Sequence, residues 1–293
     1  MEHFLQTTLN GLTTGSLYCC IAIGFTLIFG IIQLIYFAQC EMAMIGAFAF
    51  AGAFILLRPH VPSPIAVTLS LILAGLLTGG VSCLGQRLLL FPIRKAAKVK
   101  GLIVSLGFSI VLQNIVLLWI SSDDLPFPLQ SEEKWLLGGV SITHSQLWVL
   151  GGTMGTWLLT WALLYRTRLG RCMRAVAQSP EGAQLMGISV DKVVTITFAI
   201  AAGTASVAGV LMGFYNGGMR FDMGFVPGIK GFTVAILGGV GNIRGALLAG
   251  LLLGLVEGFF AGYCSSDYRD VFAFVLLIAI LLFRPHGLLG EGT

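Results

Sequence analysis

The stretch RTRLGRCMRAVAQSPEGAQLMGISVDKV, Arg166–Val193, is basic and broken, whereas nearly all of the surrounding chain is apolar. Hydrophobic residues make up 56% of the 293 residues and charged residues only 10%, against about 25% charged in an ordinary soluble domain. Because so few charges cannot cover a water-exposed surface, most of the chain is expected to face lipid or other apolar helices. The composition predicts an all-α polytopic integral membrane protein, in which this stretch is the exception.

Apolar segments of about the length of a membrane span, or shorter, follow one another along the chain. They run over residues 9–32, 42–57, 64–85, 101–120, 147–165, 191–214, 230–240, 245–263 and 270–283. The segment 230–240 is too short to cross a bilayer and is expected to be a half-helix, and polar residues after the first segment predict a broken or re-entrant turn. We expect about eight transmembrane helices plus broken pieces, in one domain covering residues 1–293.

Lysine and arginine residues are unevenly distributed among the loops, and this bias orients the spans. Twelve of the seventeen lie in the loop 86–100, the segment 166–192, the turn around Arg244 and the tail around Arg284. The positive-inside rule places these on the cytoplasmic side, with the N-terminus outside and the C-terminus inside. The acidic loop 121–146 then faces the opposite side, together with the other five cations, Arg58, Lys134, Arg220, Lys230 and Arg269.

Capping signals predict a short helix within the basic stretch. Ser179 is a good N-cap residue, Pro180 suits the first helical position, and Glu181 lies in the first turn. The helix is expected to end at Gly187, because glycine is common just beyond helix C-termini. The sequence therefore predicts a well-bounded polar helix at the cytoplasmic surface, between two membrane helices.

Arg171 and Arg174 precede this helix and, at a spacing of three residues, are expected to share a helix face. Two interpretations of the whole stretch remain open. It is either an amphipathic helix that rests on anionic lipid or a rigid lever that docks into a partner protein.

Ionisable residues within the apolar segments are few, which argues against a catalytic centre. Glu41 lies at the start of one predicted span and Glu257 within another, and neither has a neighbouring histidine or metal-ligating cluster. The stretch GGVGNIRG, Gly238–Gly245, follows no strand and precedes no Walker lysine, so it predicts a turn between a half-helix and the next span. We expect no cofactor, metal or ATPase site in this chain.

Polar residues within the spans are candidates for a substrate path. Glu257 either has a transport function or makes a structural hydrogen bond, because an ionisable group in a span is costly. Gln39 and Glu41 follow the predicted break, where they either contact substrate or cap the next helix. Gln113 and Asn114, in the middle of a span, either join helices, which is the favoured interpretation, or line the path.

Four blocks of sequence, in this order, resemble the branched-chain amino-acid permeases of the LivH type, which belong to ATP-binding-cassette importers. The blocks are NGLTTGSLYCCIAIGFTLIFGIIQLIYFAQCEMAMIGAF (10–48), GRCMRAVAQSPEGAQLMGISVDKV (170–193), AILGGVGNIRGALLAGLLLG (235–254) and FRPHGLLG (283–290). Within the second block, EGAQLMG is similar to the E-A-A-x-x-x-G signature in the coupling loop of such permeases. The similarity covers nearly the entire chain.

The resemblance implies an importer with two different permeases, two cytoplasmic ATPase subunits, on which ATP acts, and a periplasmic substrate-binding protein. It implies that the coupling loop docks into a groove on an ATPase through Arg171, Arg174, Pro180, Glu181, Gly182, Ala183 and Gly187. The implied substrates are branched-chain or related neutral amino acids. In such a zwitterion the ammonium group would suit Glu41, and the carboxylate would suit the N-terminus of a half-helix.

Two features depart from the family pattern. Family members commonly have histidine and glycine where this chain has Gln39 and Cys40, although the following acid is retained as Glu41. Gly182 stands where alanine is usual, which costs the helix up to about 1 kcal/mol. A function of another class also remains open, namely an ion-gradient-driven secondary transporter or channel with Glu257 as its proton or cation site.

Overall fold

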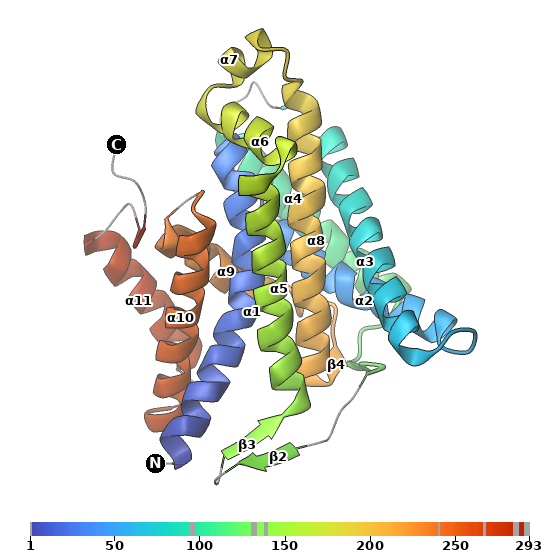
Figure 1. Ribbon diagram of the computed structural model, residues 1–293, viewed down its shortest axis with the longest axis vertical. Coiled ribbons are helices and arrows are strands. Elements are labelled where there is room, and N and C mark those ends of the chain that lie inside the picture. The colour runs from blue at the N-terminus through green and yellow to red at the C-terminus, as the bar shows by residue number, and fades with distance from the viewer. Residues whose placement is uncertain are drawn as a thin grey trace.

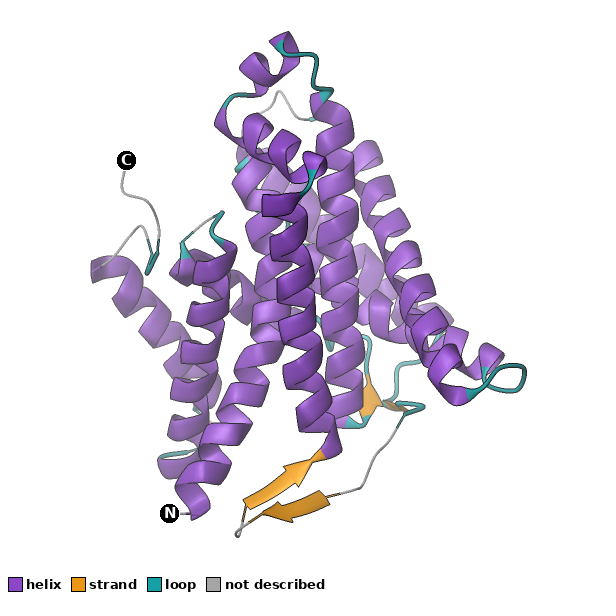
Figure 2. Ribbon diagram, viewed as in Figure 1, coloured by secondary structure: helices purple, strands orange, loops and turns teal. Residues whose placement is uncertain are grey.

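The computed structural model describes residues 2–93, 98–129, 134–137, 140–239, 241–265, 268–283 and 287–289. Most of these residues are helical, and the long helices lie side by side in a bundle (Figures 1 and 2). Three cations that the charge pattern places on the cytoplasmic side, Arg94, Lys95 and Arg284, lie outside the described residues.

Seven helices in the described part of the chain are long and apolar enough to cross a membrane. They are α1 (Glu2–Ile32), α2 (Gln39–Leu57), α3 (Ser63–Gly85, continued by the π-helix η1, Gln86–Leu90), α4 (Lys98–Trp119), α5 (His144–Arg166), α8 (Val190–Asn216) and α10 (Ile243–Tyr263). Two apolar helices, α9 (Phe225–Gly238) and α11 (Arg269–Phe283), are shorter, and at about 1.5 Å per residue neither reaches across a bilayer core of about 30 Å. The predicted all-α polytopic membrane fold is confirmed, and the last expected span, 270–283, corresponds to α11.

Helix α1 forms the centre of the bundle and packs directly on α5, α8, α9 and α10. Glycines bring the backbones of α1 and α10 together. A Cβ on Gly15 would lie 2.6 Å from the carbonyl oxygen of Gly250, and a Cβ on Gly254 would lie 2.2 Å from the Cα of Gly15. Because glycines four residues apart share one helix face, the two helices approach without intervening side chains.

The stretch Gly238–Gly245 contains the predicted turn between a half-helix and a span. Gly239 and Gly241 have φ angles of 94° and 86°, which glycine adopts without steric cost. Asn242 then caps the N-terminus of α10. The half-helix α9 begins at Phe225, five residues before the apolar segment 230–240.

Short strands lie at the end of the bundle that also holds the N-terminus (Figure 2). Strand β1 (Leu125–Pro126) pairs antiparallel with β4 (Gly218–Met219), and β2 (Lys134–Leu137) pairs antiparallel with β3 (Val140–Thr143). Three of these strands fall in the acidic segment 121–146, for which the sequence predicts only a loop. Helices α6 (Arg168–Gln178) and α7 (Pro180–Leu185) lie at the opposite end (Figure 1).

Basic residues gather at the α6–α7 end. Arg244 lies 5.9 Å from the ring centroid of Tyr165, at the end of α5. Arg87 and Lys192 line one pocket where η1 meets α8. Among the described residues, the basic loops that were predicted to share one side of the membrane therefore do lie at one end of the bundle.

Candidate functional site

The predicted short helix in the basic stretch is α7. The Oγ of Ser179 accepts a hydrogen bond from the backbone N–H of Gly182 at 3.0 Å, and Pro180 occupies the first helical position. Gly187 follows the helix with a φ of 78°, and Ala183 is buried on the side that faces the bundle. The predicted N-cap and stop residues are therefore confirmed. Such caps matter because an isolated peptide of six residues would not stay helical in water.

Helix α6 fastens α7 to the bundle. Its buried face carries Met173 and Val176, which pack in one apolar cluster with Val193 of α8. The Nη1 of Arg174 donates a hydrogen bond of 2.6 Å to the carbonyl oxygen of Leu164, near the end of α5. A force applied to α7 would therefore reach both α5 and α8.

The tip of α7 is apolar and exposed. Leu185 is 89% exposed and Met186 is 83% exposed, although both side chains are usually buried. Figure 1 shows α7 at the far end of the molecule, beyond the long helices. Arg171 and Glu181 are also exposed. Exposed apolar side chains accompanied by charged ones are typical of a protein contact site.

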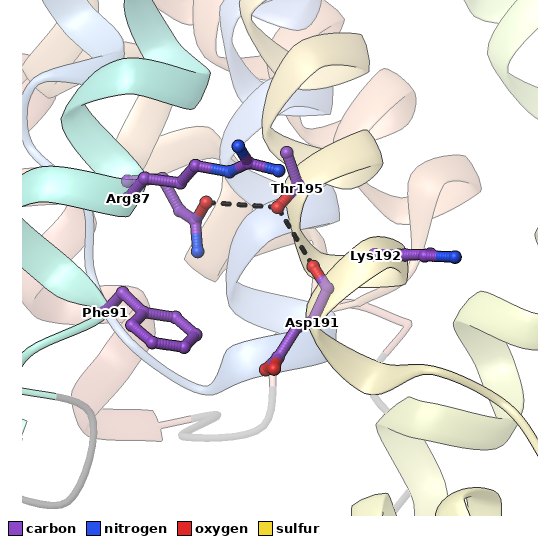
Figure 3. Close-up of a pocket in the computed structure, with 6 residues that line it drawn as sticks. Arg87, Phe91, Asp191, Lys192 and Thr195 are labelled. Atoms are coloured by element: carbon purple, nitrogen blue, oxygen red, sulfur yellow. Dashed lines mark hydrogen bonds between the residues drawn. The ribbon is translucent and has the colours of Figure 1, made fainter.

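A pocket of about 390 Å³ lies at the same end, between η1 and the start of α8 (Figure 3). The Oγ1 of Thr195 lies 3.2 Å from the Oε1 of Gln86 and 2.9 Å from the carbonyl oxygen of Asp191. Arg87 extends toward Thr195, whereas Lys192 points away from it (Figure 3). These polar contacts tie the end of the third span to α8, the helix that follows α7 in the chain.

The chain breaks between α1 and α2, as its polar residues predict. Residues 33–38 are not helical, and Gln33 has a φ of 53°, which is uncommon for a residue other than glycine. Gln39 is buried, and its Nε2 donates a hydrogen bond of 2.7 Å to the carbonyl oxygen of Ala201. This bond joins α2 to α8, whereas the Oε1 of Gln39 is buried and has no hydrogen-bond partner among the described residues.

Glu41 lies in the first turn of α2 and is 0% exposed. Its Oε1 accepts hydrogen bonds from the Nε2 of Gln113 at 2.7 Å and from the Oγ of Ser109 at 3.0 Å, both on α4. Its Oε2 is buried and has no hydrogen-bond partner among the residues that the structure describes. Since these two partners are neutral, the carboxylate retains acceptor capacity for a cation.

The N-terminal turn of α9 packs against the first turn of α2. A Cβ on Gly224 would lie 2.3 Å from the carbonyl oxygen of Cys40 and 3.5 Å from the Cα of Glu41. A Cβ on Gly228 would lie 2.3 Å from the Sγ of Cys40. The positive end of the α9 dipole therefore lies beside the turn that carries the buried carboxylate of Glu41.

Glu257 has different surroundings, although it is only 1% exposed. Its Oε1 lies 2.5 Å from the Nζ of Lys230 and 3.2 Å from the hydroxyl of Tyr18, and it also accepts a hydrogen bond from the Nε of Arg269. Lys230 pairs with Asp270 as well, at 2.5 Å. These side chains join α1, α9, α10 and α11. Lys230, which the charge count assigned to the side opposite the basic loops, is 2% exposed within α9, where two carboxylates neutralise it.

Helix α4 presents two neighbouring polar residues to different surroundings. Asn114 is exposed, and its Nδ2 donates to the carbonyl oxygen of Ile110 in the same helix at 2.8 Å. Gln113 reaches Glu41 instead, beside Ser109. The sequence analysis missed Ser109 and did not connect Gln113 with Glu41. The available signal was the spacing of four residues between the two, which places them on one face of an apolar helix.

Comparisons with known proteins agree with this architecture. Residues 7–281 match the family described as branched-chain amino acid transport system, permease component. The chain is 38% identical to the LivH permease of Salmonella typhimurium and 39% identical to the BraD permease of Pseudomonas aeruginosa, both named as high-affinity branched-chain amino acid transport system permease proteins. Each match covers 99% of this chain and 96% of the relative.

A more distant relative transports a different kind of substrate. The ribose import permease RbsC of Haemophilus influenzae is 23% identical over 94% of this chain and 84% of its own length. The architecture is thus shared beyond amino-acid permeases. With near-complete matches to LivH and BraD, the chain belongs to the branched-chain amino acid permease family and is a multi-pass membrane permease of the LivH type.

Proposed function

We propose that this chain is the transmembrane permease subunit of an ATP-binding-cassette importer that carries branched-chain or related neutral amino acids into the cytoplasm. The observation that carries the proposal is the capped α6–α7 unit with its exposed apolar tip, in a chain that belongs to a transport permease family. The names of the LivH and BraD relatives support the substrate class. Separate ATPase subunits supply the energy.

The proposed assembly sits in the inner membrane of a bacterial cell. It contains a second, different permease chain, two cytoplasmic ATPase subunits and a periplasmic substrate-binding protein. The basic α6–α7 end faces the cytoplasm by the positive-inside rule, and the N-terminus lies outside. The strands and the acidic segment 121–146 then face the binding protein.

In the proposed coupling step, α7 lies in a groove on an ATPase subunit. Leu185 and Met186 provide the apolar contact, and the exposed Arg171 and Glu181 contribute polar contacts around it. An aliphatic side chain that becomes fully buried in such a contact gains about 1.5–3 kcal/mol. The same gain would follow from insertion into lipid, so the choice of a protein partner is supported by the position of α7 beyond the long helices (Figure 1) and by the match to a transport permease family.

The remaining coupling residues keep the lever rigid in this scheme. Pro180 and Gly187 bound α7, Ala183 attaches it to the bundle, and Gly182 donates to the N-cap. Arg174 connects α6 to the end of α5. Closure of the ATPases would then move α5 and α8, and this movement would switch the central substrate path from inward-facing to outward-facing.

The proposed substrate contact is Glu41. A buried carboxylate with neutral partners is costly in a membrane, and the ammonium group of an amino acid would neutralise it. The substrate carboxylate would face the N-terminal turn of α9, which packs beside Glu41. Gln39 bonds to α8 through its Nε2, but its Oε1 is buried and has no hydrogen-bond partner among the described residues, so Gln39 stays a candidate for the path beside Glu41. Asn114 is given no substrate contact in this scheme, because its amide bonds within its own helix.

An ion-gradient-driven transporter with Glu257 as its cation site is not favoured by the contacts of that residue. Lys230 and Arg269 already bind the carboxylate, so a transported proton or cation would have to displace a buried ion pair. The contacts of Glu257 support a structural role.

The proposal is tested by reconstituting the chain with candidate ATPase subunits, the second permease and the binding protein in proteoliposomes. Leu185→Ser and Glu181→Arg should abolish ATP hydrolysis stimulated by the binding protein, while Leu185→Met, which keeps an apolar tip, should retain it. Leucine uptake should fall in parallel. Wild-type uptake that needs no ATPase and stops when the proton gradient is collapsed would instead establish the secondary transporter.

A further inference from the structure

The segment Gly287–Leu289 pairs with the last residues of the half-helix α9. The backbone N–H of Leu288 donates to the carbonyl oxygen of Leu237 at 2.7 Å, and that of Leu289 donates to the carbonyl oxygen of Gly238 at 3.4 Å. The last carbonyl groups of a helix have no donor within the helix. The segment therefore supplies donors to the end of α9, and the Leu288 side chain packs against the central apolar cluster beside Leu237.

Asn242 links this segment to α10. Its Oδ1 caps α10 by accepting from the backbone N–H groups of Arg244 and Gly245 at 3.0 and 3.2 Å. Its Nδ2 donates to the carbonyl oxygen of Leu289 at 2.9 Å. One side chain thus uses its acceptor to start α10 and its donor to hold the segment against α9.

Gly287 allows the close approach that these bonds require. Its φ is 77°, and a Cβ at this position would lie 2.6 Å from the backbone nitrogen of Gly239 and 2.7 Å from the carbonyl oxygen of Ile236. A larger residue would be strained by its backbone conformation and would also press on the end of α9. The contact therefore depends on glycine here.

The opposite end of α9 forms part of the proposed substrate site. Its first turn packs on Cys40 and Glu41 through Gly224 and Gly228, and its middle is attached to α10 and α11 through Lys230. The apolar side chains of α9 also pack on α1 and α10 along the length of the helix. The bonds from Gly287–Leu289 add a polar attachment at its C-terminal end, which limits tilting of the helix and so helps to hold the position of the N-terminal turn.

We propose that Asn242 and Gly287–Leu289 are positioning elements that hold the N-terminal turn of α9 in place beside Glu41. Their consequence for transport rests on the proposed function, because it assumes that this turn receives the substrate carboxylate. The positioning of the α9 turn by Asn242 and Gly287–Leu289 does not depend on the proposed function. Cys40 reports it, since its Sγ is buried and lies against Gly228 in the N-terminal turn of α9.

The test uses the full-length protein and measures modification of each cysteine by N-ethylmaleimide, with mass spectrometry of the labelled peptides. The informative variant is Asn242→Asp, which keeps the acceptor that caps α10 but loses the donor to Leu289. Losing one such bond should speed the labelling of Cys40 by about fivefold. Gly287→Ala, which displaces the whole segment, should speed it further.

Cys19 is the internal control, because it is buried against Gly250 in the α1–α10 interface, away from this contact. Fast labelling of Cys40 with unchanged protection of Cys19 supports positioning, and general unfolding would expose both. Unchanged labelling of Cys40 in Asn242→Asp overturns the proposal. In a reconstituted complex, the same variant should lower maximal leucine uptake at wild-type assembly, whereas fast Cys40 labelling with normal uptake would contradict only the proposed substrate site.

Discussion

The two buried carboxylates of the spans, Glu41 and Glu257, occupy opposite electrostatic environments. Glu257 is bound by Lys230 and Arg269 and is approached by the hydroxyl of Tyr18. Glu41 is bound by the neutral side chains of Ser109 and Gln113 and by no cation among the described residues. The Oε2 of each carboxylate is buried without a hydrogen-bond partner in the described part of the chain, so the difference lies in the cations.

This difference separates a structural acid from a candidate binding acid. In a low-dielectric interior a carboxylate is stable when a cation accompanies it. The cations of Glu257 belong to the protein and connect α9, α10 and α11. For Glu41, the structure supplies no cation among the described residues, so an ammonium group from a substrate can complete the pair. Each prediction below tests one side of this comparison.

The largest effect is expected for Lys230→Met. Removing the lysine leaves the buried Glu257 with Arg269 as its remaining ion-pair partner and takes from the exposed Asp270 its Lys230 partner, and breaking a buried pair costs about 3–5 kcal/mol. The purified variant should unfold at a much lower temperature in detergent, or should not accumulate. The double variant Lys230→Met with Glu257→Gln should recover part of the loss. If the single variant is as stable as wild type, Glu257 is not held by this ion pair.

Glu41→Gln should show the reverse pattern, with a large loss of uptake and little loss of stability. The amide oxygen of glutamine can still accept from Ser109 and Gln113, but the charge for the substrate ammonium is gone. A charge-assisted hydrogen bond is worth about 1.5–3 kcal/mol, so leucine uptake should fall about ten- to hundredfold. Normal uptake in this variant would remove Glu41 from the substrate site.

A smaller effect is expected at Gln113, for which the adjacent Asn114 is a matched control. Gln113→Leu removes one hydrogen bond to Glu41, worth about 1 kcal/mol, and should lower uptake about fivefold. Asn114→Leu, on the exposed side of α4, should leave uptake unchanged. Equal effects of the two substitutions on uptake would show that α4 acts through packing and not through the contact with Glu41.

The smallest effect is expected for Tyr18→Phe. The hydroxyl lies 3.2 Å from the Nζ of Lys230, the Nη2 of Arg269 and the Oε1 of Glu257, but the ion pairs persist without it. Hydrogen bonds between membrane helices average about 0.6 kcal/mol, so the melting temperature in detergent should fall only slightly. Tyr263→Phe, at an exposed position, is the control. A loss as large as that of Lys230→Met would mean that the hydroxyl organises the whole network.

The features that sequence predicted correctly are mostly local. Ser179, Gly187 and the glycines after α9 act through their own turns, so their residue types reveal their backbone conformation. The break after α1 was visible for the same reason, because polar residues interrupt an apolar run. The short strands within 121–146 were not visible, since each is only two to four residues long.

The roles of the polar side chains within the bundle depended on long-range contacts. Gln39 and Asn114 are candidates for a substrate path, and their amide nitrogens bond to α8 and to the residue's own helix, respectively, which the sequence did not predict. Gln113 was expected to join helices or to line the path, with the first favoured, and it does join α4 to α2, but the sequence did not identify Glu41 as its partner. Helical periodicity places residues on a face, but it does not say which neighbouring helix that face meets.

By itself, the sequence determined the membrane class, the order of the spans, the segregation of basic residues and the capped helix α7. Each follows from composition or from interactions between residues that are close in the sequence. These interactions do not depend on how the helices pack. Only the tertiary structure decided that Glu257 has cations and that Glu41 has none among the described residues. Tyr18 and Glu257 are 239 residues apart in the chain, and Glu41 and Gln113 are 72 apart, so their proximity exists only after the helices pack.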